Sequence, residues 1–395
     1  MSNTTTNRLH FIDAIRAFAI TMMLQGHFVH ALLAQDYRDR SNIIYACWEY
    51  FRGITAPTFF TITGFVFVFL LLKKQDLGLK NPRVKKGVSR AIKLICWGYL
   101  LRLSFYAVFT GTINPSFFMV DVLQCIGISL LLLIVIYALG HRLNLRFLQY
   151  IFLAIGILVF LFQPLYHNAE LSYLPEPIAN IFTGHYGSVF TIFPWFGYVC
   201  FGAFLAVIFK RFGQQTRFYS FITSLLFLCG FLLIFYSSDF LILLNDLTGF
   251  SVFKSVAYNN FLYMRLGDVF ILFASFVLLK KIFRSDLISD IGSRTLSIYI
   301  IHFFILYGSW FGLGLTKFFS RDLTGIQAIF GAGLFIVTVC FMVLYYYKNE
   351  EKLLSYKNSV VQWLYDIISE VKKLILNSSR VRTVQDRYEQ IKSRF

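Results

Sequence analysis

The chain has 395 residues, of which 57% are hydrophobic and 14% are charged, and its formal charge at pH 7 is +17. Soluble domains have about 25% charged residues, so this composition excludes a disordered chain and argues against a soluble nucleic-acid-binding protein. Few charges, long apolar runs and a basic excess are typical of a multi-spanning membrane protein.

Ten stretches are apolar and long enough to cross a bilayer, which takes about 20 residues of α-helix. In chain order they cover residues 11–34, 54–72, 91–109, 117–139, 147–166, 189–209, 218–236, 258–279, 295–315 and 325–347. The run 239–250 is also apolar but too short to span. We therefore predict an all-α fold, a polytopic bundle of about ten transmembrane helices within one domain, residues 1–347.

The basic residues predict the orientation of this bundle. If the N-terminus is cytoplasmic, the inner segments between the predicted spans hold 27 Lys and Arg residues, the outer segments hold six, and four lie within spans. Cytoplasmic loops of membrane proteins carry such an excess. An odd number of spans would disturb this alternation. We therefore expect both termini to be cytoplasmic.

The composition changes after residue 347. The tail, residues 348–395, is charged, and its apolar residues recur with helical spacing. They include Leu353, Leu354, Val360, Val361, Leu364, Ile367, Ile368 and Val371. This pattern favours a basic amphipathic helix on the cytoplasmic surface of the membrane, in contact with lipid. A dimerising helix is the alternative, which leaves a homodimer open.

The six cysteines form no covalent or metal-binding pattern. None belongs to a C-x-x-C motif or has a histidine at metal-binding spacing, and five lie inside apolar runs. Cysteines in such runs pack as small hydrophobic residues. We expect no disulfide and no metal site.

The first predicted span is unusually polar. Its sequence, FIDAIRAFAITMMLQGHFVHALLA, contains Asp13, Arg16, Gln25, His27 and His30. An ionisable group near mid-membrane costs about 2.5–3.5 kcal/mol, so such groups usually face a cavity or a partner. Arg16 and His27 lie 11 residues apart, which is about 16.5 Å along a helix but only about 20° around it. One helix face therefore carries a cation near the inner side and an imidazole near the outer side.

Other spans place polar residues at matching depths, counted from the span ends. The outer layer, at the depth of His27, contains Asp121, Gln124, Arg265 and Asp268. The inner layer, at the depth of Arg16, contains Arg90, Lys93, Tyr299 and His302. The sequence thus predicts two chambers, a cationic inner one and an outer one with His, Asp and Arg. An imidazole oriented by a carboxylate is the usual arrangement of a general base.

Several motifs on this topology resemble a known superfamily. The run RLHFIDAIRA at residues 8–17, followed by His27, resembles the opening of the transmembrane acyltransferase superfamily, and Arg16-x10-His27 resembles the first-span motif of acyltransferase family three. The stretches beginning at Arg52 (R-x3-A-P-x-F-F-x3-G), at Val122 (V-L-Q-x-I-G) and at Phe193 (F-P-W-F-G) are similar to heparan-α-glucosaminide N-acetyltransferase-like proteins. The run LSIYIIH at residues 296–302 is similar to a motif of both branches.

The resemblance implies an enzyme that moves an acetyl or other acyl group from cytoplasmic acyl-CoA to a sugar hydroxyl or amine at the outer face. It implies acetyl-CoA as the donor, a saccharide acceptor, and neither a metal nor a nucleic acid. The residues that would hold the donor are Arg16, Arg90, Lys93, Tyr299 and His302. Lys93 stands where family three has a second arginine, and lysine keeps the charge but loses the bidentate fork.

The same resemblance places the chemistry in the outer chamber. His27 would act either as general base or as nucleophile through an acyl-imidazole. Asp121 or Asp268 would orient the imidazole. Gln124 or Arg265 would stabilise the oxyanion. The sequence leaves each of these pairs open.

Two other functions would use the same features. A transporter or flippase of a polar or lipid-linked solute would use the buried polar groups as its pathway. A non-catalytic membrane sensor would use the tail as a partner helix. The absence of a sizeable soluble domain in this chain favours a bacterial inner membrane as its location. The acceptor, O- versus N-acylation and the acyl chain stay open.

Overall fold

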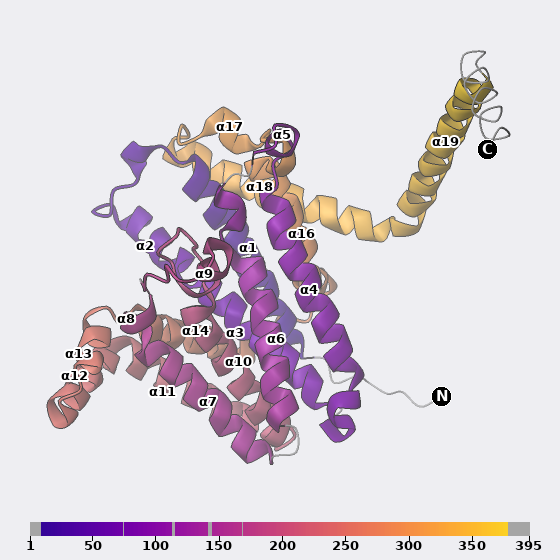
Figure 1. The fold of residues 1–395 in the computed structure, drawn as a ribbon. Helices are drawn as coiled ribbons and strands as arrows, with labels where there is room; N and C mark the ends of the chain where they lie inside the picture. The colour runs from indigo at the N-terminus through magenta and orange to yellow at the C-terminus, as the bar shows by residue number, and fades with distance from the viewer. Residues whose placement is uncertain (1–8, 74, 113–114, 141–143, 168, 378–395) are drawn as a thin grey trace. The chain divides into compact units, whose positions relative to one another are not determined.

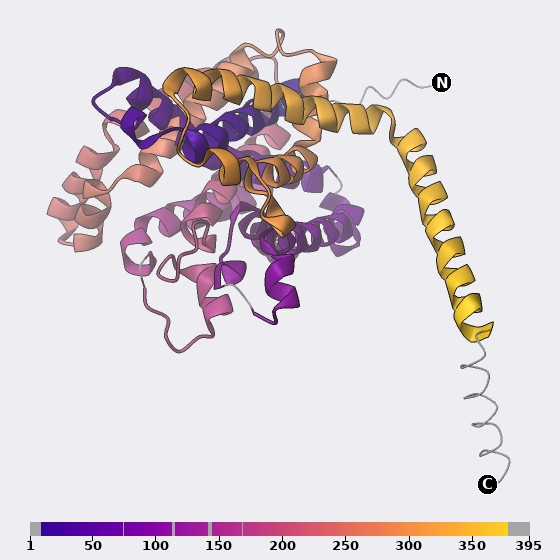
Figure 2. The same cartoon turned by 90° about the horizontal axis from the view of Figure 1, so that it is seen from above.

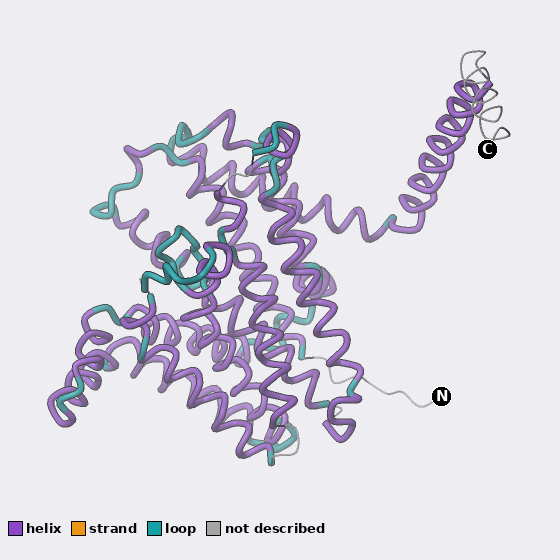
Figure 3. Tube along the Cα trace, in the orientation of Figure 1, coloured by secondary structure: helices purple, strands orange, loops and turns teal. Residues whose placement is uncertain are grey.

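The structure is a computed structural model that describes residues 9–73, 75–112, 115–140, 144–167 and 169–377. Over these ranges the regular structure consists of α-helices and short 3-10 helices, with one isolated bridge between Leu33 and Leu323. Figure 3 shows helices joined by loops and no strand in the same ranges. The prediction of an all-α fold is confirmed.

Ten helices coincide with the ten predicted spans (Figure 1). They are α1 (His10–Leu32), α3 (Thr55–Leu72), α4 (Pro82–Arg102), α6 (Val122–Gly140), α7 (Leu145–Leu161), α10 (Ile192–Phe212), α11 (Phe218–Phe235), α14 (Phe261–Leu278), α16 (Thr295–Tyr307) and α18 (Gly325–Lys348). The helices between them are α2 (Ile43–Arg52), α5 (Phe105–Phe109), α8 (Gln163–Tyr166), α9 (Glu176–Phe182), α12 (Ser237–Thr248), α13 (Ser251–Tyr258), α15 (Asp286–Ser293) and α17 (Leu315–Phe319). The long α19 (Glu350–Asn377) follows α18.

Six helical segments of the described chain are long and apolar enough to cross a membrane. They are Ile43–Leu72, Ser116–Gly140, Ile192–Phe212, Phe218–Phe235, Phe261–Leu278 and Gly325–Lys348. A seventh is reached if Asp286–Ser293 and Thr295–Phe311, which meet at a bend of 69°, form one span. Apolar helices of this number and length are those of an integral membrane protein.

The other three predicted spans lie on α1, α4 and α7, which fall outside this set for physical reasons. The α7 helix has only 17 residues. The α4 helix begins at Pro82, because the side chain of Asn81 caps it by accepting from the Arg83 N–H. Its first turns are therefore basic rather than apolar, and it ends at Arg102 instead of running to residue 109. The α1 helix carries the polar residues already noted in the first span.

The helix α10 lies at the centre of the packing and contacts both α3 and α7, whereas α4 packs on α6 and α11 on α14. The contact between α3 and α10 is a close approach of two backbones. A Cβ atom on Gly64 would lie 2.0 Å from the carbonyl oxygen of Val199, and one on Gly202 would lie 1.8 Å from that of Thr61. Small residues at helix interfaces permit such approaches in membranes. Gly64 is the last residue of the motif stretch that begins at Arg52.

The chain divides into two compact units, residues 1–340 and 341–395, with the boundary inside α18. The first unit contains the polar residues of interest, and α12 and α13 pack together as a projecting pair at its edge (Figures 1 and 2). The second unit contains α19, which exposes Leu354, Val361, Leu364 and Ile368. Residues 378–395 of the predicted tail lie outside the described residues.

Candidate active site

A cavity of about 670 Å³ lies in the first unit, which is the size of a small-molecule site. Its walls come from α1, α2, α3, α4, α6, α10, α14 and α16. His27 of α1 and Arg90 of α4 both line it. The sequence predicted two chambers, one at the depth of His27 and one at the depth of Arg16 and Arg90. In the structure, residues of both layers line one cavity.

A second, smaller pocket of about 160 Å³ adjoins this cavity. The two spaces have four lining residues in common, namely Phe59, Thr63, Arg90 and Thr295. The smaller pocket is also lined by Arg16, Arg83 and Lys86. Four cations, which we call the basic cluster (Arg16, Arg83, Lys86 and Arg90), therefore line a pocket that lies beside the cavity of His27.

Three members of the basic cluster lie on one face of α4. Arg83, Lys86 and Arg90 are spaced by three and four residues, which places their side chains on the same side of a helix. Lys93, three residues after Arg90, lies only about 20° from Lys86 around the helix. It is exposed, however, and lines neither space. The motif resemblance pointed to Arg90 and Lys93, whereas the lining of the smaller pocket groups Arg90 with Arg83 and Lys86.

Arg16 joins the basic cluster from α1. Its Nη2 donates to Oγ1 of Thr295, 3.3 Å away, and its Nη1 lies 3.9 Å from Oδ1 of Asp13. Thr295 is the first residue of α16. The N-terminal ends of α1 and α16 therefore meet at the basic cluster.

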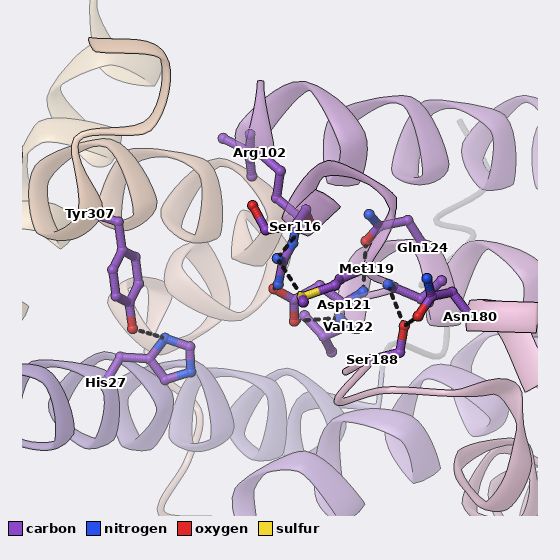
Figure 4. Close-up of polar contacts among 12 residues, drawn as sticks. His27, Arg102, Ser116, Met119, Asp121, Val122, Gln124, Asn180, Ser188 and Tyr307 are labelled. Atoms are coloured by element: carbon purple, nitrogen blue, oxygen red, sulfur yellow. Dashed lines mark hydrogen bonds and ion pairs between the residues drawn. The ribbon is translucent and has the colours of Figure 1, made fainter. Parts of the chain in front are cut away.

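The two helices meet again at His27, farther along α1. Nδ1 of His27 lies 3.3 Å from Nε2 of His302 and 3.4 Å from Oη of Tyr307. Figure 4 shows the Tyr307 hydroxyl pointing at the imidazole. His302 is fully buried and lines neither space. The sequence placed it in the inner layer with Arg16, and the structure corrects this, because seven residues of α16 rise about 10.5 Å from Thr295.

The contacts of His302 fix the hydrogen positions on both imidazoles. Nδ1 of His302 bonds to the backbone carbonyl oxygen of Tyr299, which can only accept, so this nitrogen carries a hydrogen. In a neutral imidazole the other nitrogen is then an acceptor. Nε2 of His302 thus accepts from Nδ1–H of His27. The lone pair of His27 is left on Nε2, on a residue that lines the cavity.

The carboxylate of Asp121 has other partners than His27. Its Oδ2 accepts from Nη2 of Arg102 at 3.0 Å, and its Oδ1 accepts from the N–H of Val122 at 2.7 Å (Figure 4). Gln124 accepts through Oε1 from the N–H of Asp121 at 3.2 Å. It is fully buried and lines neither space. In the described structure Asp121 and Gln124 thus organise the start of α6.

Asp268 is likewise engaged. It accepts from Nη1 of Arg265 at 2.9 Å and from the hydroxyl of Tyr50 at 2.6 Å. The guanidinium of Arg265 lies 4.3 Å from the ring centroid of Tyr50 and lines the cavity. No hydrogen bond joins His27 to Asp121 or Asp268 in the part of the chain described. The imidazole is oriented by His302 instead.

Arg52, the last residue of α2, is the first residue of one motif stretch, but no role was predicted for it. Arg52 lines the cavity. A Cβ atom on Gly26, the residue before His27, would lie 3.3 Å from Cγ of Arg52. The guanidinium carbon lies 5.5 Å from the ring centroid of Trp48, whose Nε1 donates to Oε1 of Gln25 at 2.7 Å. The signal for Arg52 was a cation placed in an otherwise apolar segment.

The six cysteines are free. Within the described ranges, no group of three or more His, Cys, Asp or Glu residues is arranged to hold a metal ion.

The described helices thus place a partly buried, oriented histidine and a basic cluster around one cavity. Comparison with known families gives the class: the acyltransferase domain of acyltransferase family 3 matches residues 9–347. The match covers every helix that lines the cavity, and the chain belongs to this family. Among curated proteins, none matches the chain.

Proposed function

We propose that this membrane acyltransferase moves an acetyl group from acetyl-CoA to a hydroxyl or amine of a saccharide acceptor. The observation that carries this proposal is that His27, with its lone pair on Nε2, lines the same cavity as Arg90 of the basic cluster. A phosphate-bearing donor and a proton-accepting imidazole would then meet in one space.

The basic cluster would bind the phosphates of the donor. Arginine and lysine form short, charge-assisted hydrogen bonds to phosphate oxygens. Arg16 and His27 lie about 16.5 Å apart along one face of α1. The long pantetheine arm would run along this face and bring the thioester to His27. The backbone of Tyr299, whose side chain also lines the cavity, holds His302 and so the imidazole.

His27 would act as general base through Nε2. It would take the proton of the acceptor hydroxyl while the hydroxyl oxygen attacks the thioester carbonyl carbon. The carbon–sulfur bond would then break, and Nε2 would return the proton to the departing thiolate. The products would be the acetyl ester of the acceptor and free CoA, with His27 neutral again.

A covalent route would use the same nitrogen. Nε2 would attack the thioester carbonyl carbon and the carbon–sulfur bond would break, which leaves an acyl-imidazolium on His27 and CoA as the thiolate. The acceptor hydroxyl would then take the acyl group and give its proton to the thiolate. Both routes need the tautomer that His302 selects. Of the two oxyanion donors proposed from the sequence, Arg265 lines the cavity, and we assign it this role.

We further propose that the ten cavity-forming and surrounding helices span the inner membrane of a bacterium, with both termini cytoplasmic. The support is the excess of basic residues in the predicted inner segments. Acetyl-CoA would then reach the basic cluster from the cytoplasm. The tail would lie on the same membrane surface in contact with lipid. A homodimer formed through this tail is the alternative.

The test is acyl transfer by the purified protein from labelled acetyl-CoA to a mixture of saccharides. We expect His27→Ala to lower the rate by about 1,000-fold or more, because the general base is lost, while acetyl-CoA binding persists. His30→Ala is the matched control, since His30 lies one turn further on the same helix and is exposed. Full transfer by His27→Ala would exclude this site, and acceptor movement into liposomes without any donor would favour a transporter.

A further inference from the structure

We propose that Arg52 binds an anionic group of the acceptor, so that the enzyme prefers acidic saccharides. This inference rests on the proposed function, because it concerns the acceptor of the same site. The ligand chemistry is a carboxylate or a phosphate close to the group that is acylated.

The charged side chains that line the cavity carry this proposal. There are six: Arg40, Glu49, Arg52, Arg90, Asp121 and Arg265. Four of them have partners of opposite charge. Arg40 pairs with Glu49 at 2.8 Å, Asp121 with Arg102 at 3.0 Å, and Arg265 with Asp268 at 2.9 Å. Within the residues that the structure describes, neither an ion pair nor a hydrogen bond engages the guanidinium of Arg52 or of Arg90.

The two cations without such partners lie at different ends of the cavity. Arg90 belongs to the part that continues into the smaller pocket beside Arg16. Arg52 packs beside Gly26 and so next to His27. Arg52 is partly buried, and a charge withdrawn from water is costly unless a counter-charge meets it. The donor phosphates would supply that counter-charge to Arg90, and the acceptor, whose reacting group must approach His27, would supply it to Arg52.

Arg52 is held in place by its neighbours. Its aliphatic stem packs against Gly26, and its guanidinium stacks over Trp48, which is itself fixed by Gln25. A planar guanidinium held in this way is suited to bidentate binding of a carboxylate or phosphate. The hydroxyl of Thr55, another residue of the cavity wall, is buried and has no hydrogen-bond partner among the described residues. It could donate to the same anion.

The test compares three aryl glycosides that share one sugar ring: a glucuronide, its uncharged carboxamide, and a glucoside 6-phosphate. Binding of each is measured without donor, and transfer to each is measured with labelled acetyl-CoA. We expect the wild-type protein to favour the glucuronide or the phosphate over the carboxamide by about tenfold or more in kcat/KM, as for a charge-assisted hydrogen bond. The better of the two acidic glycosides identifies the source of the anion.

Two variants test the residue itself. Arg52→Gln should remove the preference by lowering kcat/KM for the acidic glycosides about tenfold and for the carboxamide much less, whereas Arg52→Lys should keep part of the preference. Lys254→Gln, which removes an exposed cation on α13, should change neither. Unaltered acetyl-CoA binding by Arg52→Gln shows that the variant is folded.

Three results would overturn the inference. The first is an equal loss of kcat/KM with all three glycosides in Arg52→Gln, which an oxyanion or purely structural role predicts. The second is a preference for the acidic glycosides that survives in this variant. The third is a wild-type protein whose binding and transfer do not depend on the charge of the glycoside. The proposed function fails separately. If the acidic glycosides bind in an Arg52-dependent way but no acceptor is acylated, the anion site stands and the acyl transfer does not.

Discussion

The two ends of the cavity bind charge in different ways. At the end that adjoins the smaller pocket, the basic cluster presents four cations, of which Arg83, Lys86 and Arg90 are exposed. At the end near His27, the polar groups are partly or fully buried and bonded to one another, with His27 linked to His302 and Arg265 linked to Asp268. The first end is suited to attract a flexible, multiply charged ligand, and the second is suited to hold reacting groups in one geometry.

This difference predicts how substitutions divide between binding and chemistry. Under the proposed function several cations of the basic cluster bind the same phosphates, so the loss of one should weaken donor binding and spare the chemical step. At the end near His27 each bond sets the position of the next group. Loss of one member should therefore lower kcat and leave KM for acetyl-CoA unchanged.

The largest effect after loss of His27 is expected at His302, which is a positioning residue. His302→Phe removes the acceptor for Nδ1–H of His27, so the reactive tautomer and orientation are no longer fixed. We expect kcat to fall by about 100-fold, with KM for acetyl-CoA within a factor of about two. The measurement is steady-state transfer at varied acetyl-CoA.

His302→Gln provides the matched rescue, because its side-chain oxygen can accept from His27, and it should recover part of the rate. Tyr307→Phe should have a smaller effect, since the Tyr307 hydroxyl lies 3.4 Å from Nδ1 and the helix contact persists. A loss in KM and kcat alike, without recovery in His302→Gln, would point to a general packing role instead.

The next largest effect is expected at Arg90, and Lys93 on the same helix provides the comparison. Arg90→Gln should raise KM for acetyl-CoA by about tenfold, because a charge-assisted contact to phosphate is lost, and kcat should change little. Lys93→Gln should leave both constants unchanged, since Lys93 is exposed and lines neither space. Equal effects of the two variants would show that the motif spacing, rather than the lining of the two spaces, defines the donor site.

Much of the fold was predictable because hydrophobic length is a strong signal in membranes. Each predicted span falls on a helix, and the run 239–250, judged too short to span, lies mostly on the 12-residue α12. Helix ends were less predictable. The start of α4 is set by an Asn81 cap and Pro82, which an apolar window ignores because it begins only where the hydrophobic run does.

The site was predictable only along a single helix. Arg16 and His27 could be placed on one face of α1 from their spacing, since a helix has a fixed rise and turn. The partner of His27 could not be found in this way, because the register between α1 and α16 is a matter of tertiary packing. Depth counted from the span ends put His302 beside Arg16, whereas the contact with Thr295 at the start of α16 moves His302 outward.

The smallest effect on the reaction is expected where α3 and α10 touch. Gly202→Ala would place a Cβ atom 1.8 Å from the Thr61 carbonyl oxygen, so the two helices must move apart. We expect a loss of about 1–3 kcal/mol in the free energy of unfolding, as for an overpacked contact, seen as a lower midpoint of thermal unfolding in detergent. Transfer per folded molecule should stay within a factor of about two, because no residue of the basic cluster or the histidine pair is altered.

Gly333→Ala on α18, where a Cβ atom meets nothing within 4 Å, is the control and should be neutral. A stable Gly202→Ala variant that had lost donor binding or turnover would show that this contact sets the geometry of the cavity, and that the two ends are coupled through its wall.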